Sequence, residues 1–409
     1  QPFPEAEVVA ALKGKKAVTV LERSEQTALT TLVTQALFKG CENASTLGVR
    51  PEGSALGARH EGIPAIKTMP RLTTAIFGLG GHDLQPRHLI AAFKNMEGKG
   101  SSAPLIYLGS QFFSKSPSPR MAELQKRLKA AYPATEQMAL ETGDNPRLLP
   151  DSAFRVRFHS VGGYGTIASG KLLTDILAGV LNMNSKSAPK YGSEKSGAPT
   201  NFYITLSPEP IKITNAELED VEVVISPDHR AFSHTNPLRG LADGGTFIMQ
   251  SNATPEEVWA ELPPAARKTI REKNINFFII DAFGVAKRNA PSAELATRMM
   301  GIAFIGAVAG HVQQVAAGAS ADAILEKIGK QIAKKFGAKG AAVVEGNMAV
   351  IREGLQSTTR VDYSAAAFKK IDARPAPIAL HNASLSAAMC QSGGSSACGG
   401  MFDREYFEE

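Results

Sequence analysis

The pattern of hydrophobic and polar residues predicts an α/β architecture for the first part of the chain. The apolar run at 15–22 is typical of a buried strand, and the segment 27–40 has the spacing of an amphipathic helix. Strand-like runs at 65–81 and 103–110 flank a further helical stretch with a proline near its start. Strands that alternate with helices indicate a largely parallel sheet with helices packed on its faces.

The pattern breaks over residues 116–150 and then returns to alternating strands and helices. The break holds a Ser/Pro-rich stretch and one charged amphipathic helix, so we expect a linker there. From 151 to 375 the sequence predicts a second α/β domain with a helical C-terminal half. Its strands are expected at 154–160, 200–207, 221–226, 244–251 and 275–282, and its helices at 166–181, 255–261 and 264–272, followed by three longer ones between 292 and 356.

Residues 376–409 differ in composition from everything before them. They are rich in small and polar residues and end in the acidic, aromatic stretch MFDREYFEE. Such a segment has too little apolar surface to form a core by itself, so we expect an extended tail that lies along a partner. The predicted fold class is therefore α/β, with two domains, each a mainly parallel sheet flanked by helices, plus this tail.

Composition excludes several classes of function. The net charge of +6 over 409 residues comes from scattered basic residues, without the clustered Lys/Arg and aromatic residues of a nucleic-acid groove. No apolar run is long enough to span a membrane, and the N-terminus does not resemble a signal peptide, so we expect a cytoplasmic protein. The three cysteines form no disulfide framework or cluster motif, and the histidines lack metal-ligand spacing. We predict no metal site and no catalytic residue on this chain.

The stretch VGGYGTIASGK at 161–171 follows a predicted strand and opens a predicted helix, which is the layout of a phosphate-binding turn. Residues 165–171 read G-x-x-x-x-G-K, but Leu172 stands where a P-loop has the Ser or Thr that binds magnesium. Residues 163–168 read G-x-G-x-x-A, but the region about 20 residues on is basic and lacks the acid that binds a ribose. The pattern favours a polyanion other than magnesium-ATP or NAD, and a tight turn that binds nothing is the alternative.

A second glycine-rich block, KYGSEKSGAPTNF at 190–202, carries cationic and hydroxyl donors on flexible backbone. Loops at the carboxyl ends of neighbouring strands share one crevice in a doubly wound sheet, so we expect both segments to bind one phosphate-rich ligand. An exposed loop with solvated lysines is an equally open interpretation. The candidate ligand-binding residues are Gly162, Gly163, Tyr164, Gly165, Thr166, Ser169, Lys171, Lys190, Tyr191, Ser193, Lys195, Ser196 and Gly197.

These two glycine-rich blocks resemble the gamma domain of the 2-oxoacid:ferredoxin oxidoreductase family. The similarity continues in order through VVISPD, LADGGTFIMQSNATPEEVWAELP, KNINFFIIDAFGVA and AILEKIGKQIAKKFGAKGAAVVEGNMAVI. Before it, QPFPEAEVVAALKGKKAVTVLERSE and IFGLGGHDLQPRHLIAAFKNM resemble the transketolase C-terminal-like domain that precedes the gamma domain in pyruvate-type members, to which the chain is most similar. The resemblance implies a transketolase C-terminal-like domain over 1–115 and a gamma domain over 151–375. The sequence departs from the family at SEQTALTT, where a KEPGA-type turn is expected, and in the tail.

The resemblance implies oxidative decarboxylation of a 2-oxoacid by thiamine diphosphate. Electrons would pass through iron–sulfur clusters to ferredoxin or flavodoxin, and the acyl group would pass to coenzyme A. The chain has no G-D-G…N segment for thiamine diphosphate and its magnesium, and no cysteine quartet. We therefore expect thiamine diphosphate, magnesium and 4Fe–4S clusters on partner chains of pyrimidine-binding, thiamine diphosphate and ferredoxin type. The chain alone would then be inactive.

Coenzyme A is the ligand that the resemblance implies for this chain, because the gamma domain is associated in the family with binding coenzyme A and closing over the active site. Its pyrophosphate or 3′-phosphate would be the anion at the glycine turn. Two alternatives stay open. One is a structural assembly subunit whose glycine loops bind no ligand, and the other is an independent nucleotide-binding protein.

Overall fold

The computed structural model contains two compact units, Gln1–Arg147 and Leu148–Glu409, and each is considered by itself. The predicted tail and most of the second glycine-rich block lie outside the described residues. Within the described part, no helix combines the length and the apolar character that a membrane span requires. The described residues are 3–46, 60–79, 83–98, 103–109, 119–138, 140, 142–191, 199–214, 217–290, 293–316 and 320–372.

The N-terminal unit is built on a small parallel sheet in the order β1-β2-β3. As the pattern predicts, β1 (Ala17–Glu22), β2 (Arg71–Phe77) and β3 (Leu105–Leu108) alternate with α2 (Ala28–Thr46) and α3 (Pro86–Glu97). Two separate apolar clusters form its interior, one around Leu37 and one around Ile106. The remaining helices of the unit are α1 (Glu5–Leu12), α4 (Pro119–Ala131) and α5 (Thr135–Met138).

The C-terminal unit is built on a sheet in the order β10-β9-β8-β7-β4-β6-β5. β4, β7, β8 and β9 are parallel, whereas β6 and β10 are antiparallel to their neighbours. β5 is antiparallel to β6 and so points the same way as β4, which makes the sheet mainly parallel, as predicted. The strands are β4 (Phe154–Val161), β5 (Asn184–Tyr191), β6 (Pro199–Ser207), β7 (Val221–Ser226), β8 (Leu241–Gln250), β9 (Asn276–Ile280) and β10 (Thr359–Arg360).

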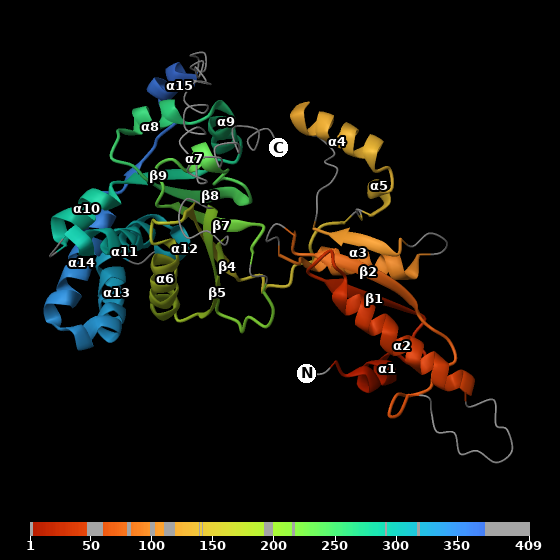
Figure 1. Cartoon of the computed structure of the whole chain (residues 1–409). Coiled ribbons are helices and arrows are strands. Elements are labelled where there is room, and N and C mark those ends of the chain that lie inside the picture. The colour runs from red at the N-terminus through yellow and green to blue at the C-terminus, as the bar shows by residue number, and fades with distance from the viewer. Residues whose placement is uncertain are drawn as a thin grey trace, which may run out of the picture. The chain divides into compact units, whose positions relative to one another are not determined.

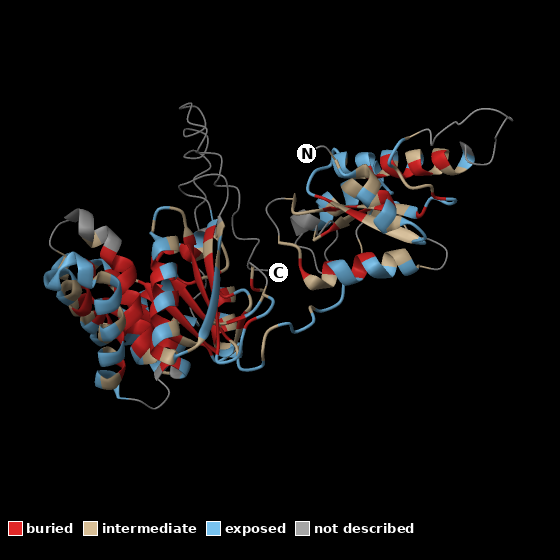
Figure 2. Cartoon of the chain, turned by 90° about the horizontal axis from the view of Figure 1, so that it is seen from below, coloured by how far each residue is buried: buried red, intermediate tan, exposed pale blue. Residues whose placement is uncertain are grey.

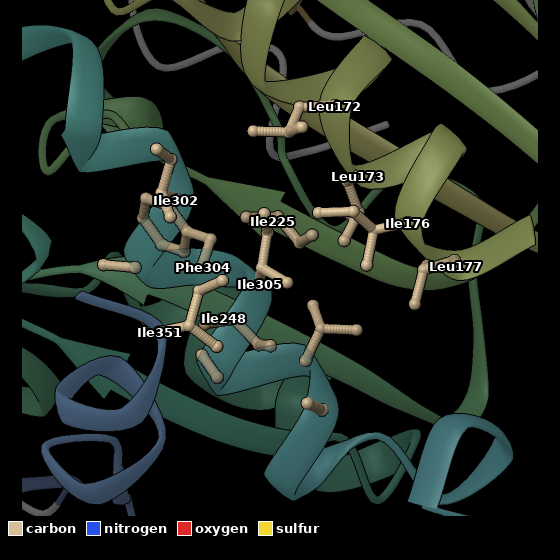
Figure 3. Packing of buried hydrophobic residues seen from close by; sticks show 14 of the residues in the cluster. Leu172, Leu173, Ile176, Leu177, Ile225, Ile248, Ile302, Phe304, Ile305 and Ile351 are labelled. Carbon is tan, nitrogen blue, oxygen red and sulfur yellow. The ribbon is translucent and has the colours of Figure 1, made fainter. Parts of the chain in front are cut away.

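Helices cover both faces of this sheet, and each face has its own apolar core (Figures 1 and 2). α6 and α11 pack on the first face, where Leu173 and Ile176 of α6 point toward Ile305 of α11 (Figure 3). α8, α9 and α15 cover the second face, around the fully buried Trp259. The helices are α6 (Thr166–Leu181), α7 (Ala231–His234), α8 (Pro255–Glu261), α9 (Pro264–Glu272), α10 (Ala282–Asn289), α11 (Ala293–His311), α12 (Gln313–Ala316), α13 (Ala321–Phe336), α14 (Ala341–Gln356) and α15 (Ala366–Asp372).

Strand β5 is one element of this unit that the hydrophobic pattern does not predict. Its sequence NSKSAPKY is polar, and no strand is expected there. Among the strands that the structure describes, β5 pairs only with β6 and so lies at the edge of the sheet. Edge strands tolerate proline and carry lysine because one side of their backbone has no neighbour in the sheet, so Lys186, Pro189 and Lys190 suit this position.

Candidate functional site

The order of the strands places a topological switch point between β4 and β7. From β4 the chain runs through α6 to β5 on one side of β4, while β7 lies on its other side. α6 covers the first face, but the segment 227–240 after β7 packs on the second face through Leu238. Ligands of open α/β sheets bind at the carboxyl ends of the strands at such a point. The candidate site is therefore this switch-point edge, formed by residues 162–166 and 227–230.

The glycine turn between β4 and α6 has the backbone of an anion-binding turn. Gly163 and Gly165 have φ values of 112° and 69°, which residues with a Cβ rarely adopt. Gly165 is the N-cap residue of α6, and it makes no side-chain cap. The N–H of Ser169 bonds to the Gly165 carbonyl at 3.0 Å, so the N–H groups of residues 166–168 have no acceptor within the helix. These groups and the helix dipole favour a bound anion.

The predicted side chains of this turn point in different directions. Thr166 is buried, and its hydroxyl donates to Ser160 Oγ at 3.0 Å. Ser169 is buried against α11, where a Cβ at Gly301 would lie 1.7 Å from the Ser169 Oγ. Lys171 is exposed and makes no ion pair with any residue that the structure describes. Of these three side chains, Lys171 is the one that is exposed to solvent.

The second glycine-rich block begins at the same edge of the sheet. Val161 at the end of β4 lies opposite Pro199 at the start of β6, and β5 ends beside the same part of β6. β6 therefore separates the ends of β4 and β5. Lys190 forms an ion pair with Glu217, so a phosphate at this lysine would compete with a carboxylate. The other predicted residues of this block lie outside the described residues, and their role stays a prediction. They are the side chain of Tyr191 and residues Ser193, Lys195, Ser196 and Gly197.

Two further residues of the switch-point edge, Asp228 and Arg230, are not found by motif analysis. Asp228 is 1% exposed, and its Oδ1 accepts a hydrogen bond from the N–H of Arg230 at 2.8 Å. Its Oδ2 has no hydrogen-bond partner of good geometry among the described residues. Burial and the Asp228 carboxylate raise the pKa of Tyr164, and Arg230 opposes them, so these three side chains interact across the switch point. The sequence signal is the acid that follows the buried strand VVIS.

β4 also carries two buried polar residues on the face that points away from α6. Arg157 Nη2 donates to the carbonyls of Pro237 and Arg239 at 2.8 Å and 2.7 Å. His159 Nε2 lies 2.6 Å from the Thr235 Oγ1. Burial and the nearby positive charge of Arg157 lower the pKa of His159 to about 3, so its ring is neutral at physiological pH.

In the N-terminal unit, the segment SEQTALTT at 24–31 leads into α2, and the N-terminus of α2 is capped by a side chain of the protein itself. The buried carboxylate of Glu22, at the end of β1, accepts a hydrogen bond from the N–H of Thr30 at 2.5 Å. Thr30 lies in the first turn of α2, where an external anion would otherwise bind. The glycine turn at 162–165, by contrast, leaves the N-terminus of α6 without a side-chain cap.

Two cavities among the described residues contain none of the predicted ligand-binding residues. One, of about 160 Å³, lies at the amino ends of β8 and β9 and is lined by His311 and Arg360 among others. The other, of about 580 Å³, lies between α13 and α14. No cluster of three or more possible metal-ligating side chains occurs within the described ranges. The candidate site is thus a turn and a helix end at the sheet edge.

The C-terminal unit is similar in sequence to known proteins. Residues 155–357 match the family model described as pyruvate ferredoxin/flavodoxin oxidoreductase. A pyruvate:ferredoxin oxidoreductase of Moorella thermoacetica is 25% identical over 241 residues, covering 59% of this chain and 20% of that protein. A putative pyruvate-flavodoxin oxidoreductase of Synechocystis is 28% identical over 201 residues, covering 49% of this chain and 16% of that protein. The chain therefore spans a fifth or less of the length of these relatives.

Solved structures with a similar arrangement cover about half of the chain. The pyruvate oxidoreductase subunit PORC of Thermotoga maritima gives a TM-score of 0.39 at 20% identity, covering 51% of this chain and 99% of that one. The gamma subunit of a keto/oxoacid ferredoxin oxidoreductase from Geobacter sulfurreducens gives a TM-score of 0.36 at 17% identity. This match covers 50% of this chain and 95% of that one.

Proposed function

Because residues 155–357 match the family model of pyruvate ferredoxin/flavodoxin oxidoreductase, we propose that this chain is the part of a 2-oxoacid oxidoreductase that binds coenzyme A and helps to close the active site. The reaction is the oxidative decarboxylation of a 2-oxoacid, with pyruvate as the first candidate, to its acyl-coenzyme A. The names of the relatives from Moorella thermoacetica and Synechocystis support this substrate and a ferredoxin or flavodoxin as the electron carrier.

The observation that carries the proposal is the uncapped N-terminus of α6 at the switch point. Backbone N–H groups of residues 166–168 and the helix dipole favour an anion there, and Lys171 supplies a free positive charge one turn further on. Coenzyme A carries a pyrophosphate and a 3′-phosphate, and either one suits such a helix end. Neither group needs a protein-bound magnesium ion at this turn or an acid for a ribose.

The remaining chemistry is assigned to partner chains. A carbanion formed by decarboxylation needs an electron sink, which side chains do not supply, and thiamine diphosphate is that group in the proposed complex. A 4Fe–4S cluster takes four thiolates, and this chain has three cysteines. The residues of this chain therefore do not fit these groups. We propose partners of pyrimidine-binding, thiamine diphosphate and ferredoxin type, in a cytoplasmic complex that is inactive without them.

Thermal melting of the full chain with coenzyme A tests the proposal. Ligand at 100 times its dissociation constant stabilises the folded state by about 2.7 kcal/mol, which corresponds to a shift of about 5–10 °C. Lys171→Ala should reduce the shift. Lys268→Ala, at an exposed site on α9 of the second face, should leave it unchanged. No shift at saturating coenzyme A would instead favour the alternative of a structural assembly subunit.

A further inference from the structure

Strand β4 contacts both segments that form the candidate site, the glycine turn at 162–165 and the segment that begins at 227. Its carboxyl end continues directly into the glycine turn at 162–165. Its second face binds the segment 227–240, which links β7 to β8 and carries Asp228 and Arg230 at its start. The way in which this segment is held on β4 therefore determines where Arg230 lies relative to the glycine turn.

The restraint centres on Arg157, a buried guanidinium whose hydrogen bonds go to backbone carbonyls. The residue is 5% exposed, and its Nη2 reaches the carbonyls of Pro237 and Arg239 at 2.8 Å and 2.7 Å. Its Nε has no acceptor within the described residues. Desolvation by burial lowers the pKa of Arg157, and the nearby Tyr203 and Glu217 offset only part of this effect. Burying a cation in this way is unfavourable, so the two carbonyl bonds point to a specific role.

Neighbouring contacts fix the rest of the segment. The Thr235 Oγ1 lies 2.6 Å from Nε2 of the His159 ring. The same hydroxyl donates to the carbonyl of Ala231 at 3.3 Å, at the C-terminal end of the short helix α7. At the start of the segment, Ser226 Oγ donates to the carbonyl of Asp228 at 3.0 Å. The segment is thus held at its beginning by β7 and, in its middle and at its end, by β4.

We infer that Arg157 is a positioning residue for the candidate site. Through the carbonyls of Pro237 and Arg239 it fixes the segment 227–240 on β4, and it thereby holds Arg230 beside the glycine turn where the anionic ligand binds. The identity of that ligand, coenzyme A, rests on the proposed function. The restraint of the segment rests on the hydrogen bonds alone.

The test compares Arg157→Met with Arg155→Met in the full chain. Arg155 lies two residues earlier on β4 and pairs with Glu222 and Asp220, away from the switch point. Hydrogen exchange is followed in peptides from 228–240, where several amides are hydrogen-bonded in the native fold. Arg157→Met should raise their exchange and weaken coenzyme A binding, each by about tenfold or more, because two hydrogen bonds are lost. Arg155→Met should lower the melting temperature while leaving both quantities unchanged.

Each outcome decides the inference. Unchanged exchange over 228–240 in Arg157→Met overturns the restraint, and raised exchange with unchanged coenzyme A affinity overturns the role in the site. If Arg157→Met does not fold, Arg157→Lys, which keeps the charge but has a single nitrogen, takes its place. A wild-type chain that binds no coenzyme A overturns the proposed function instead, and the exchange comparison then decides the restraint by itself.

Discussion

Ser169 on α6 and Gly301 on α11 approach so closely that a Cβ at Gly301 would lie 1.7 Å from the Ser169 Oγ. The two helices meet at this point without a gap, and their apolar side chains continue the contact through the larger core. The direction of α6, whose N-terminus forms the candidate site, is therefore determined by packing against α11.

Gly301→Ala should destabilise the chain by about 1–3 kcal/mol, because the added methyl group overpacks the contact between the two helices. Ser169→Gly should relieve part of this loss, since the nearest remaining atom, the Ser169 Cα, lies 3.4 Å away. Gly346→Ala on α14 is the matched control, because no atom lies within 4 Å of its added Cβ. Urea unfolding measures all three changes, and a Gly301→Ala chain as stable as wild type would contradict the packing described here.

His159 should make the folded state sensitive to acid. Its folded pKa of about 3 lies below the unfolded value of 6.5, so the unfolded chain binds the proton more readily. The stabilisation is fully present above pH 6.5 and is lost as the pH falls below it, by up to about 1.4 kcal/mol per pH unit. Between pH 7.5 and 5.5, wild type should lose about 1.4 kcal/mol more unfolding free energy than His159→Gln.

The exposed His229 provides the control for this pH dependence. His229→Gln removes a histidine that is exposed to solvent, and its unfolding is followed over the same pH range as that of His159→Gln. If the unfolding free energies of wild type and His159→Gln change in parallel with pH, the buried His159 ring does not contribute to the acid sensitivity.

Lys171→Ala and Lys190→Ala should each raise the Michaelis constant for coenzyme A in the assembled enzyme. Loss of one charge-assisted contact should raise this Michaelis constant by about 10- to 150-fold. Glu217→Gln should have the opposite effect, because it releases Lys190 from its ion pair. Unchanged constants in both lysine variants would exclude these side chains from the binding site.

The sequence predicts the parts of the site that depend on local structure. A strand, a glycine turn and a helix follow one another over 154–181, and the glycines mark positions where positive φ values are needed. The side chains of Thr166 and Ser169 show where local reasoning ends. Their hydroxyl groups match a phosphate-binding motif. In the fold, however, the Thr166 hydroxyl donates to Ser160 and the Ser169 hydroxyl packs against α11, and only the tertiary structure reveals these contacts.

The part of the site formed by residues 227–230 could not be predicted, because its position depends on the order of the strands in the sheet. Asp228 and Arg230 are more than 60 residues beyond the glycine turn, and they approach Tyr164 because β7 pairs with β4. Arg157 and His159 appear in the sequence as polar residues of a strand. Their contacts with the segment 227–240 follow from the crossover on the second face of the sheet.

Calorimetric titration of coenzyme A into the full chain, its Gly165→Val variant and its Gly340→Val variant tests the central claim most directly. Gly165 and Gly340 are both N-cap glycines with positive φ, of α6 and α14, and both have open space at the Cβ position. Valine strains the backbone at both positions, since Gly165 is left-handed and Gly340 has a φ of 102° and a ψ of 157° that only glycine adopts readily. Only valine at 165, however, blocks a phosphate at the candidate site. The account predicts saturable binding to wild type and to Gly340→Val, and binding weakened by about tenfold or more in Gly165→Val. No binding to wild type, or equal binding to all three chains, would contradict it.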